Sequence, residues 1–254
     1  MPVRKSTATA LACALSAALA LTGCGALRLP AAAPAHGPAA ASPKAPAPDA
    51  RDGANRAPVR IPGIGPRTHA RIPGSTTQAL VVSGDGPDGS IATATLHERD
   101  AAGRWHRVAG PWTGHNALRG WTDDHMADDL RSPMGVFRIG DAGGRLPDPG
   151  TRLPYDQDEE FTVSGTGFLG EPLEGSFDYV VAIDYNRVPG RTPLDKERPL
   201  GPERGGGVWI HVDHGGPTQA CVSLLRAHMA ELLRALDPAR EPVVVMGPAA
   251  ALAG

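Results

Sequence analysis

Only one segment of the chain has the periodicity of an amphipathic helix, and this limits the fold more than any other feature. Its apolar residues recur at the spacing of one helical face: Leu225, Met229, Leu232 and Leu236. Asp237-Pro238 ends the pattern, because proline cannot continue the hydrogen-bond ladder of a helix. We therefore expect one principal helix, over about residues 223–236, in an otherwise strand-based domain.

The other ordered segments are short alternating or apolar runs bounded by turn residues, as β-strands are. The expected strands cover residues 78–83, 91–98, 105–109, 135–139, 179–184, 208–212 and 243–246. A turn at residues 100–103 joins the second and third strands into a hairpin. Aromatic residues make up only 4% of the chain, against 32 Gly and 26 Pro, which favours a mainly β, loop-rich domain.

The N-terminus has the pattern of an export signal. A basic start at Arg4-Lys5 precedes an apolar run over residues 8–21, shorter than the roughly 20 residues that a membrane-spanning helix needs. The run ends in Leu21-Thr22-Gly23-Cys24, which resembles the lipobox of bacterial lipoproteins. This implies a signal peptide over residues 1–23 and a lipid on Cys24, which would anchor the protein to the outer face of the cytoplasmic membrane. The alternative is a plain signal peptide.

Ala, Pro, Gly and Arg dominate residues 24–71, with almost no apolar periodicity. Such a stretch cannot bury enough apolar surface to offset the entropy lost on ordering. We expect a disordered Pro/Ala-rich tether there, followed by one folded domain over residues 76–248. The chain carries 25 Lys and Arg against 27 Asp and Glu, so it lacks the field that recruits nucleic acid. No obligate protein partner is implied.

The cysteine count singles out one thiol. Of the 3 cysteines, Cys13 leaves with the signal peptide and Cys24 takes the lipid, so Cys221 has no partner for a disulfide. An unpaired thiol outside the reducing cytosol is open to oxidation. Cys221 is therefore either buried and inert or retained for chemistry.

His211 precedes Cys221 in the order strand, glycine-rich loop, cysteine, helix. If the helix follows Cys221 directly, its unsatisfied amides favour the thiolate and lower the pKa of the thiol. The loop over residues 213–220 would fold the thiol back against the imidazole. This predicts a thiolate–imidazolium pair with Cys221 as nucleophile and His211 as base. The amides of Ala220 and Cys221 would form an oxyanion hole.

The same stretch resembles the YkuD-type L,D-transpeptidase domain of bacterial cell-wall enzymes. The resemblance lies in Gly207-Val208-Trp209-Ile210-His211-Val212 and in Pro217-Thr218-Gln219-Ala220-Cys221-Val222-Ser223-Leu224. Weaker matches are Ser132-Pro133-Met134-Gly135-Val136-Phe137 and residues 179–186, in the expected order. The resemblance implies a YkuD-like β-sandwich and a Cys221 thioester formed on peptidoglycan stem peptides. D-Ala would be released and the acyl group transferred to an amine, with no cofactor and no metal.

Three positions depart from the family pattern. Ala220 stands where the family has glycine before the nucleophile, which would cost about 1 kcal/mol if the backbone there requires a positive φ. Gln219 and Ser223 also differ from many members, although these positions vary in the branch that matches best. Ala220 is therefore the departure that bears on activity.

Neighbouring polar residues complete the candidate site. Asp213 falls on the same side of the strand as His211 and is a candidate to orient its ring. Thr218 is expected to hydrogen-bond within the loop, and Ser223 to support the site. His214 is interpreted as an exposed loop histidine, the alternative being a second base.

The remaining candidates have structural interpretations. His228 lies too far along the predicted helix to act as the base. No role is assigned to His97, His106, His115 and His125. Core packing is expected for Trp105, Trp112 and Trp121, and a solvated loop for residues 156–160.

Other functions stay open. A wall carboxypeptidase or hydrolase on the same fold would use water in place of the amine. A peptidoglycan-binding lipoprotein with an impaired site would have Ala220 as its signature. The order His211 before Cys221 disfavours papain-like and NlpC/P60 peptidases. Zinc binding by His211, His214 and Cys221 is disfavoured by poor tetrahedral spacing.

Overall fold

The structure is a computed structural model and describes residues 59–254. The predicted signal peptide, Cys24 and the tether as far as residue 58 lie outside the described residues. The strands are β1 (Gln78–Gly84), β2 (Ile91–Arg99), β3 (Trp105–His115), β4 (Trp121–Thr122), β5 (Ser132–Pro133), β6 (Gly135–Arg138), β7 (Ala142–Gly144), β8 (Tyr155–Gln157), β9 (Val180–Ala182), β10 (Trp209–Val212), β11 (Val222–Leu224) and β12 (Val243–Pro248). The helices are α1 (Pro66–Ala70), α2 (Arg226–Ala235) and α3 (Ala249–Leu252), with 3-10 turns η1 (Pro202–Arg204) and η2 (Pro238–Arg240).

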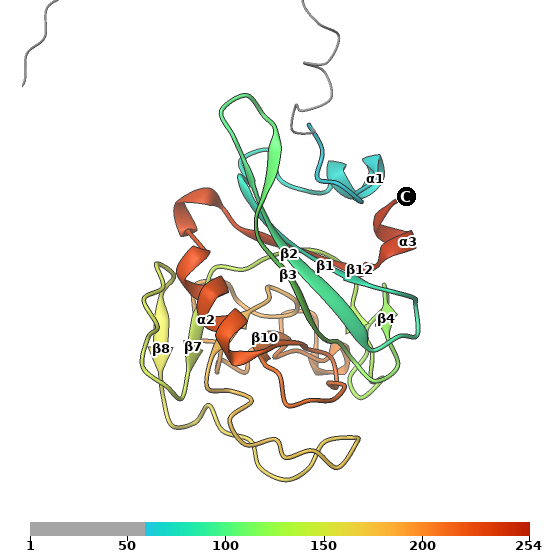
Figure 1. Cartoon of the computed structure of the whole chain (residues 1–254). Helices are drawn as coiled ribbons and strands as arrows, with labels where there is room; N and C mark the ends of the chain where they lie inside the picture. The colour runs from blue at the N-terminus through green and yellow to red at the C-terminus, as the bar shows by residue number, and fades with distance from the viewer. Residues whose placement is uncertain (1–58) are drawn as a thin grey trace, which may run out of the picture. The chain divides into compact units, whose positions relative to one another are not determined.

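Within residues 59–254, ten strands form one mixed sheet in the order β6-β12-β1-β2-β3-β11-β10-β9-β7-β8. Figure 1 shows the long strands β1, β2, β3 and β12 side by side. The short strands β4 and β5 pair separately. The expectation of a mainly β domain is confirmed, and every predicted strand is present. β3 extends beyond its predicted end to His115, and β9 is shorter than predicted. None of the described helices is long and apolar enough to cross a membrane.

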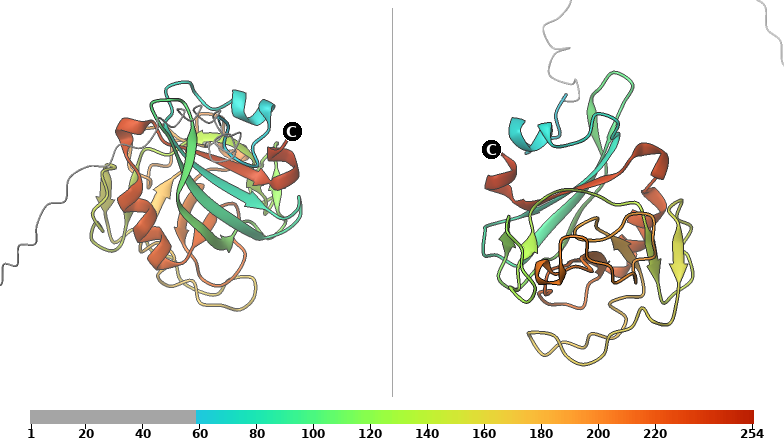
Figure 2. Two further views of the ribbon diagram at one scale, coloured as in Figure 1. Left: turned by 45° about the horizontal axis from the view of Figure 1, so that its top comes forward. Right: turned by 180° about the vertical axis from the view of Figure 1, so that it is seen from behind.

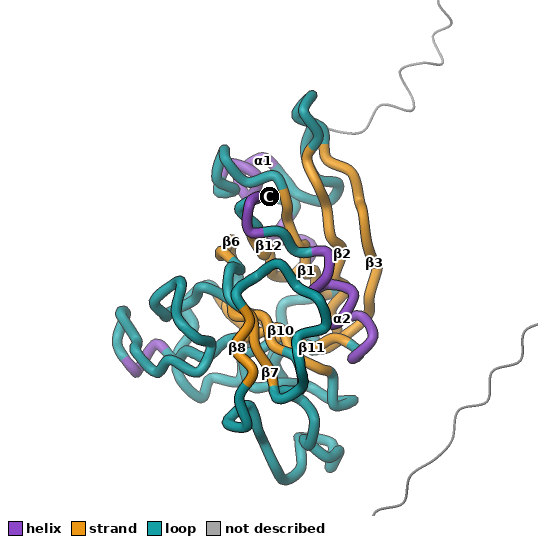
Figure 3. The backbone as a smooth tube through the Cα atoms, turned by 90° about the vertical axis from the view of Figure 1, so that its left-hand side faces the viewer, coloured by secondary structure: helices purple, strands orange, loops and turns teal. Residues whose placement is uncertain are grey.

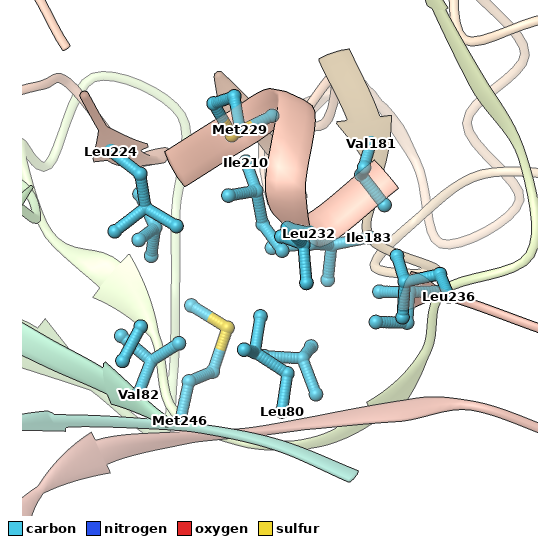
Figure 4. Close-up of a cluster of buried hydrophobic side chains, with 14 of the residues drawn as sticks. Leu80, Val82, Val181, Ile183, Ile210, Leu224, Met229, Leu232, Leu236 and Met246 are labelled. Atoms are coloured by element: carbon cyan, nitrogen blue, oxygen red, sulfur yellow. The ribbon is translucent and has the colours of Figure 1, made fainter. Parts of the chain in front are cut away.

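The main core lies between the long strands and the site-bearing half of the sheet. Leu80 and Met246 project from β1 and β12 toward side chains of β9, β10, β11 and α2 (Figure 4). The buried face of α2 is formed by Met229, Leu232 and Leu233. This core supports both strands that carry the candidate residues, because Ile210 and Leu224 belong to it.

A second core covers the opposite face of β1 and β12, and it corrects the predicted domain boundary. Ile61 and Ile64 are buried there against Leu252, although both were predicted to lie in the tether. The N–H of Gly65 donates to the carbonyl of Leu252 at 2.8 Å, which joins the segment before α1 to α3 near the C-terminus (Figure 2). The buried side chains of Ile61 and Ile64, together with this hydrogen bond, pack residues 59–71 onto the domain.

The predicted helix start is wrong. Residues 222–224 are not helical but form β11, which pairs parallel with β10 and antiparallel with β3. Leu225, counted on the apolar helix face, is 52% exposed, and α2 begins only at Arg226. Strand pairing is possible because Gly114 of β3 has no Cβ where the carbonyl of Ser223 approaches. A long-range pairing therefore outweighs the local helical spacing.

We expect Gly114→Ala to destabilise the fold by about 2 kcal/mol or more, because the added Cβ would collide with the Ser223 carbonyl and overpacking costs roughly 1–3 kcal/mol. Urea unfolding followed by circular dichroism measures the change. Gly74→Ala is the matched control, since a Cβ at that position meets nothing within 4 Å. Equal stability of the two variants would contradict the close approach of β3 and β11.

Candidate active site

Two neighbouring parallel strands carry the candidate residues. His211 lies on β10 and is buried, and Cys221 immediately precedes β11. The intervening loop is held by Thr218, whose hydroxyl donates to the Cys221 carbonyl at 2.6 Å, as the sequence predicts. The Ser132 hydroxyl donates to the same carbonyl at 3.2 Å. The cysteine backbone is thus fixed from two sides.

Cys221 and His211 line one cavity of about 510 Å³. The other walls are the glycine segment 205–207, residues 217–220, residues 125–128 and the segment 163–177, here called the cover loop. Most of the chain around β7, β8, β10 and β11 is loop (Figure 3). The cavity is therefore built by loops on a small strand platform, where binding residues are common.

The thiol of Cys221 is protonated at neutral pH. Burial raises the pKa of this thiol to about 11, although the Trp209 N–H, which donates to Sγ at 3.4 Å, favours the thiolate. The S–H points to the carbonyl of Gly207 at 3.7 Å. The predicted lowering of the pKa is wrong, because burial of the thiol disfavours the thiolate and a strand, not a helix N-terminus, follows Cys221.

His211 is a neutral imidazole with a defined tautomer. Its Nδ1 lies 2.9 Å from the carbonyl of Val212, and since a carbonyl only accepts, Nδ1 carries the proton and Nε2 is free to accept one. Burial lowers the pKa of His211 to about 4, outweighing the Val212 hydrogen bond. The Phe177 ring packs nearly perpendicular to the His211 ring, with the two ring centroids 5.4 Å apart. The resting pair is therefore neutral, not thiolate–imidazolium.

Asp213 does not orient His211, which corrects the sequence-based expectation. Its Oδ1 accepts hydrogen bonds from Nδ1 of His115 at 2.9 Å and from the Ser223 hydroxyl at 2.8 Å. The pKa of Asp213 is lowered overall. Burial raises it, but the hydrogen bonds from His115 and Ser223 outweigh burial, so the carboxylate stays ionised. The strand register explains why Asp213 contacts Ser223 and His115: on β11, Ser223 pairs with His211 of β10 on one side and with His115 of β3 on the other.

His214 is not an exposed loop residue. Its side chain is only 6% exposed, lines the cavity and lies 3.1 Å through Nδ1 from Oε1 of Glu171. The ring is stacked on His211 with centroids 5.9 Å apart and planes 13° from parallel. The sequence analysis missed Glu171, because nothing in its distance along the chain from the Cys221 motif indicates that the cover loop brings it to His214.

The remaining histidines and tryptophans divide clearly. His125, to which the sequence assigned no role, lines the same cavity, and its Nδ1 lies 3.0 Å from Oδ1 of Asp129. His228 stacks on Trp112 away from the cavity, as expected. The three tryptophans expected in the core are buried: Trp105, Trp112 and Trp121.

Ala220 causes no backbone strain. It is not among the residues of the described chain with positive φ, so its Cβ carries no left-handed penalty. In the part of the chain that the structure describes, the N–H groups of Ala220 and Cys221 donate to no protein acceptor. Both remain available to bind an oxyanion.

Neither protein-family models nor curated proteins match this chain. Among residues 59–254, no three His, Cys, Asp or Glu side chains converge as metal ligands do. The function must therefore be inferred from the residues and their geometry.

We expect Cys221 to react slowly with iodoacetamide at pH 7 and about tenfold faster with each pH unit up to pH 10, because only the thiolate reacts. Mass mapping of the tryptic peptide that carries Cys221 gives the rate. In urea the rate should level off near pH 9, since an exposed thiol has a pKa of about 8.5. A plateau below pH 8 in the folded protein would instead indicate a thiolate–imidazolium pair.

Proposed function

We propose that this chain is a YkuD-type L,D-transpeptidase that acts on peptidoglycan stem peptides through a Cys221 thioester. The observation that carries the proposal is the shared cavity, which both Cys221 and the ring of His211 line, with Nε2 of His211 free to accept a proton. The order of motifs supports the same assignment. The proposed enzyme needs no cofactor, because thiol, imidazole and backbone amides supply the nucleophile, base and oxyanion donors.

In the first half-reaction, Sγ of Cys221 attacks the carbonyl carbon between the third stem residue and D-Ala. The thiol proton passes to Nε2 of His211, and the N–H groups of Ala220 and Cys221 bind the oxyanion. Collapse breaks the C–N bond, and His211 returns the proton to the leaving D-Ala amine. The product of this step is a thioester on Cys221.

In the second half-reaction, the amine of another stem peptide attacks the thioester carbonyl. A C–N bond forms, the C–S bond breaks and the proton from nitrogen returns to Sγ through His211. A neutral resting pair suits this cycle, because charge develops only in the transition state, where fixed dipoles stabilise it. Water as acceptor would give hydrolysis.

The N-terminal motif agrees with this substrate. A lipid on Cys24 would hold the enzyme on the outer face of the cytoplasmic membrane, in the cell envelope that contains peptidoglycan. We therefore propose that the chain is an exported lipoprotein, tethered to the membrane by its acyl chains.

Covalent labelling tests the proposal directly. We expect the wild-type protein to form one adduct with a carbapenem and Cys221→Ser to form none, because the thiol attacks the strained lactam carbonyl. Intact-mass spectrometry measures the adduct. Cys24→Ala serves as the control and should label as the wild type does. Equal labelling of Cys221→Ser and wild type would contradict the assignment of the nucleophile.

Ala220→Gly tests whether the site is impaired. We expect the rate of carbapenem acylation to change by less than about threefold, because Ala220 already lies outside the left-handed region. Time-resolved intact-mass spectra give this rate. A gain of about tenfold or more would show that the natural site is impaired and would favour the binding lipoprotein.

A further inference from the structure

A second histidine faces the cavity with a carboxylate behind it. His214 follows β10, and its Nδ1 lies 3.1 Å from Oε1 of Glu171 in the cover loop. Its ring is stacked on that of His211. The proposed acyl transfer does not use this pair, although the His214 side chain is only 6% exposed and a polar ring is costly to place in a cavity wall without a task.

The position of the Glu171 carboxylate is built into the backbone. The N–H of Leu169 donates to Oε2 at 2.7 Å, and the Glu171 carbonyl accepts from the N–H of Gly167 at 2.8 Å. Gly167 and Gly216 flank the carboxylate from opposite segments, and a Cβ on either would collide with Oε1. Both glycines therefore make room for this one side chain.

The contact with Glu171 also fixes which ring nitrogen of His214 can exchange a proton. Backbone N–H groups, first that of Glu171 itself and then that of Leu169, lower the pKa of this carboxyl even though burial opposes them. An ionised carboxylate only accepts, so Nδ1 of His214 carries the proton and Nε2 is the exchangeable nitrogen. Glu171 stabilises the imidazolium that forms when Nε2 takes a proton.

We propose that His214, backed by Glu171, is the base that deprotonates the acceptor amine in the second half-reaction. This inference rests on the proposed function. His211 then serves the thiol and the leaving amine, and His214 serves the incoming nucleophile. The two parallel rings on one cavity wall divide the proton transfers between them.

The protonation state of the acceptor amine explains why two bases are needed. An alkylamine with a pKa of about 10 arrives as an ammonium ion and cannot attack until it loses a proton. Burial leaves His211 a weak base, whereas His214 has a carboxylate partner. One ammonium proton passes to Nε2 of His214 and then to solvent. The neutral amine forms the C–N bond, and its remaining excess proton reaches Sγ through His211 as the C–S bond breaks.

The charged groups around His214 fit this role. Glu171 faces it from the cover loop, and His211 faces it from β10 as a neutral ring. The preceding Asp213 is occupied by His115 and Ser223. Glu171 is thus the carboxylate in direct contact with His214 among the described residues.

The full-length protein is assayed with a stem tetrapeptide as donor and with two acceptors, propylamine and hydroxylamine, the latter already uncharged at pH 7. We expect His214→Gln to slow amide formation with propylamine at pH 7 at least about tenfold more than it slows first-turnover D-Ala release. With hydroxylamine the loss should be under about twofold. The propylamine deficit should shrink toward pH 10.

Glu171→Gln keeps an acceptor for Nδ1 but removes the charge, and we expect a smaller loss with the same acceptor dependence. His106→Gln is the matched control, because His106 also contacts a carboxylate, Asp100, but lies on a hairpin outside the cavity. Equal losses with both acceptors would make His214 merely structural and overturn this inference alone. No D-Ala release by wild type would overturn the proposed function and the inference together.

Discussion

The pairing of β11 between β3 and β10 is the interaction on which the rest of the structure depends. It closes the sheet between the long strands and the site-bearing strands, and it brings Cys221 into the cavity that His211 also lines. The pairing requires the missing side chain of Gly114, because the Ser223 carbonyl occupies that space. The same register brings Ser223 and His115 to Asp213.

Burial decides the chemistry of the resting site. It raises the pKa of the Cys221 thiol and lowers that of His211, so both groups are neutral where a charged pair was expected. The hydrogen bond from His211 to the Val212 carbonyl then leaves Nε2 as the ring nitrogen that can accept a proton. An uncharged site also limits oxidation of the Cys221 thiol, because the thiolate is the form that oxidants attack.

Local patterns were sufficient for the seven predicted strands and for the hydrogen bond of Thr218 within its loop, and Cys221 and His211 line one cavity, whereas the short strands β4, β5, β7, β8 and β11 were not predicted. They failed where distant segments meet. The local apolar spacing assigned Ser223 and Leu224 to the helix, whereas pairing with β10 and β3, which the small Gly114 permits, makes residues 222–224 a strand. The contact of His214 with Glu171 joins two loops with no shared motif. The predicted end of the tether was wrong because the overall composition of residues 24–71 hides two buried residues, Ile61 and Ile64.

In the proposed reaction, Cys221 acts with a neutral His211 whose Nε2 is the base. Nitrogen-15 NMR of histidine-labelled protein tests it most directly, with the His211 signals assigned by their loss in His211→Gln. The account predicts a protonated Nδ1 and a bare Nε2 at pH 7, with titration only near pH 4. A doubly protonated His211 at pH 7, or a proton on Nε2 alone, would contradict it.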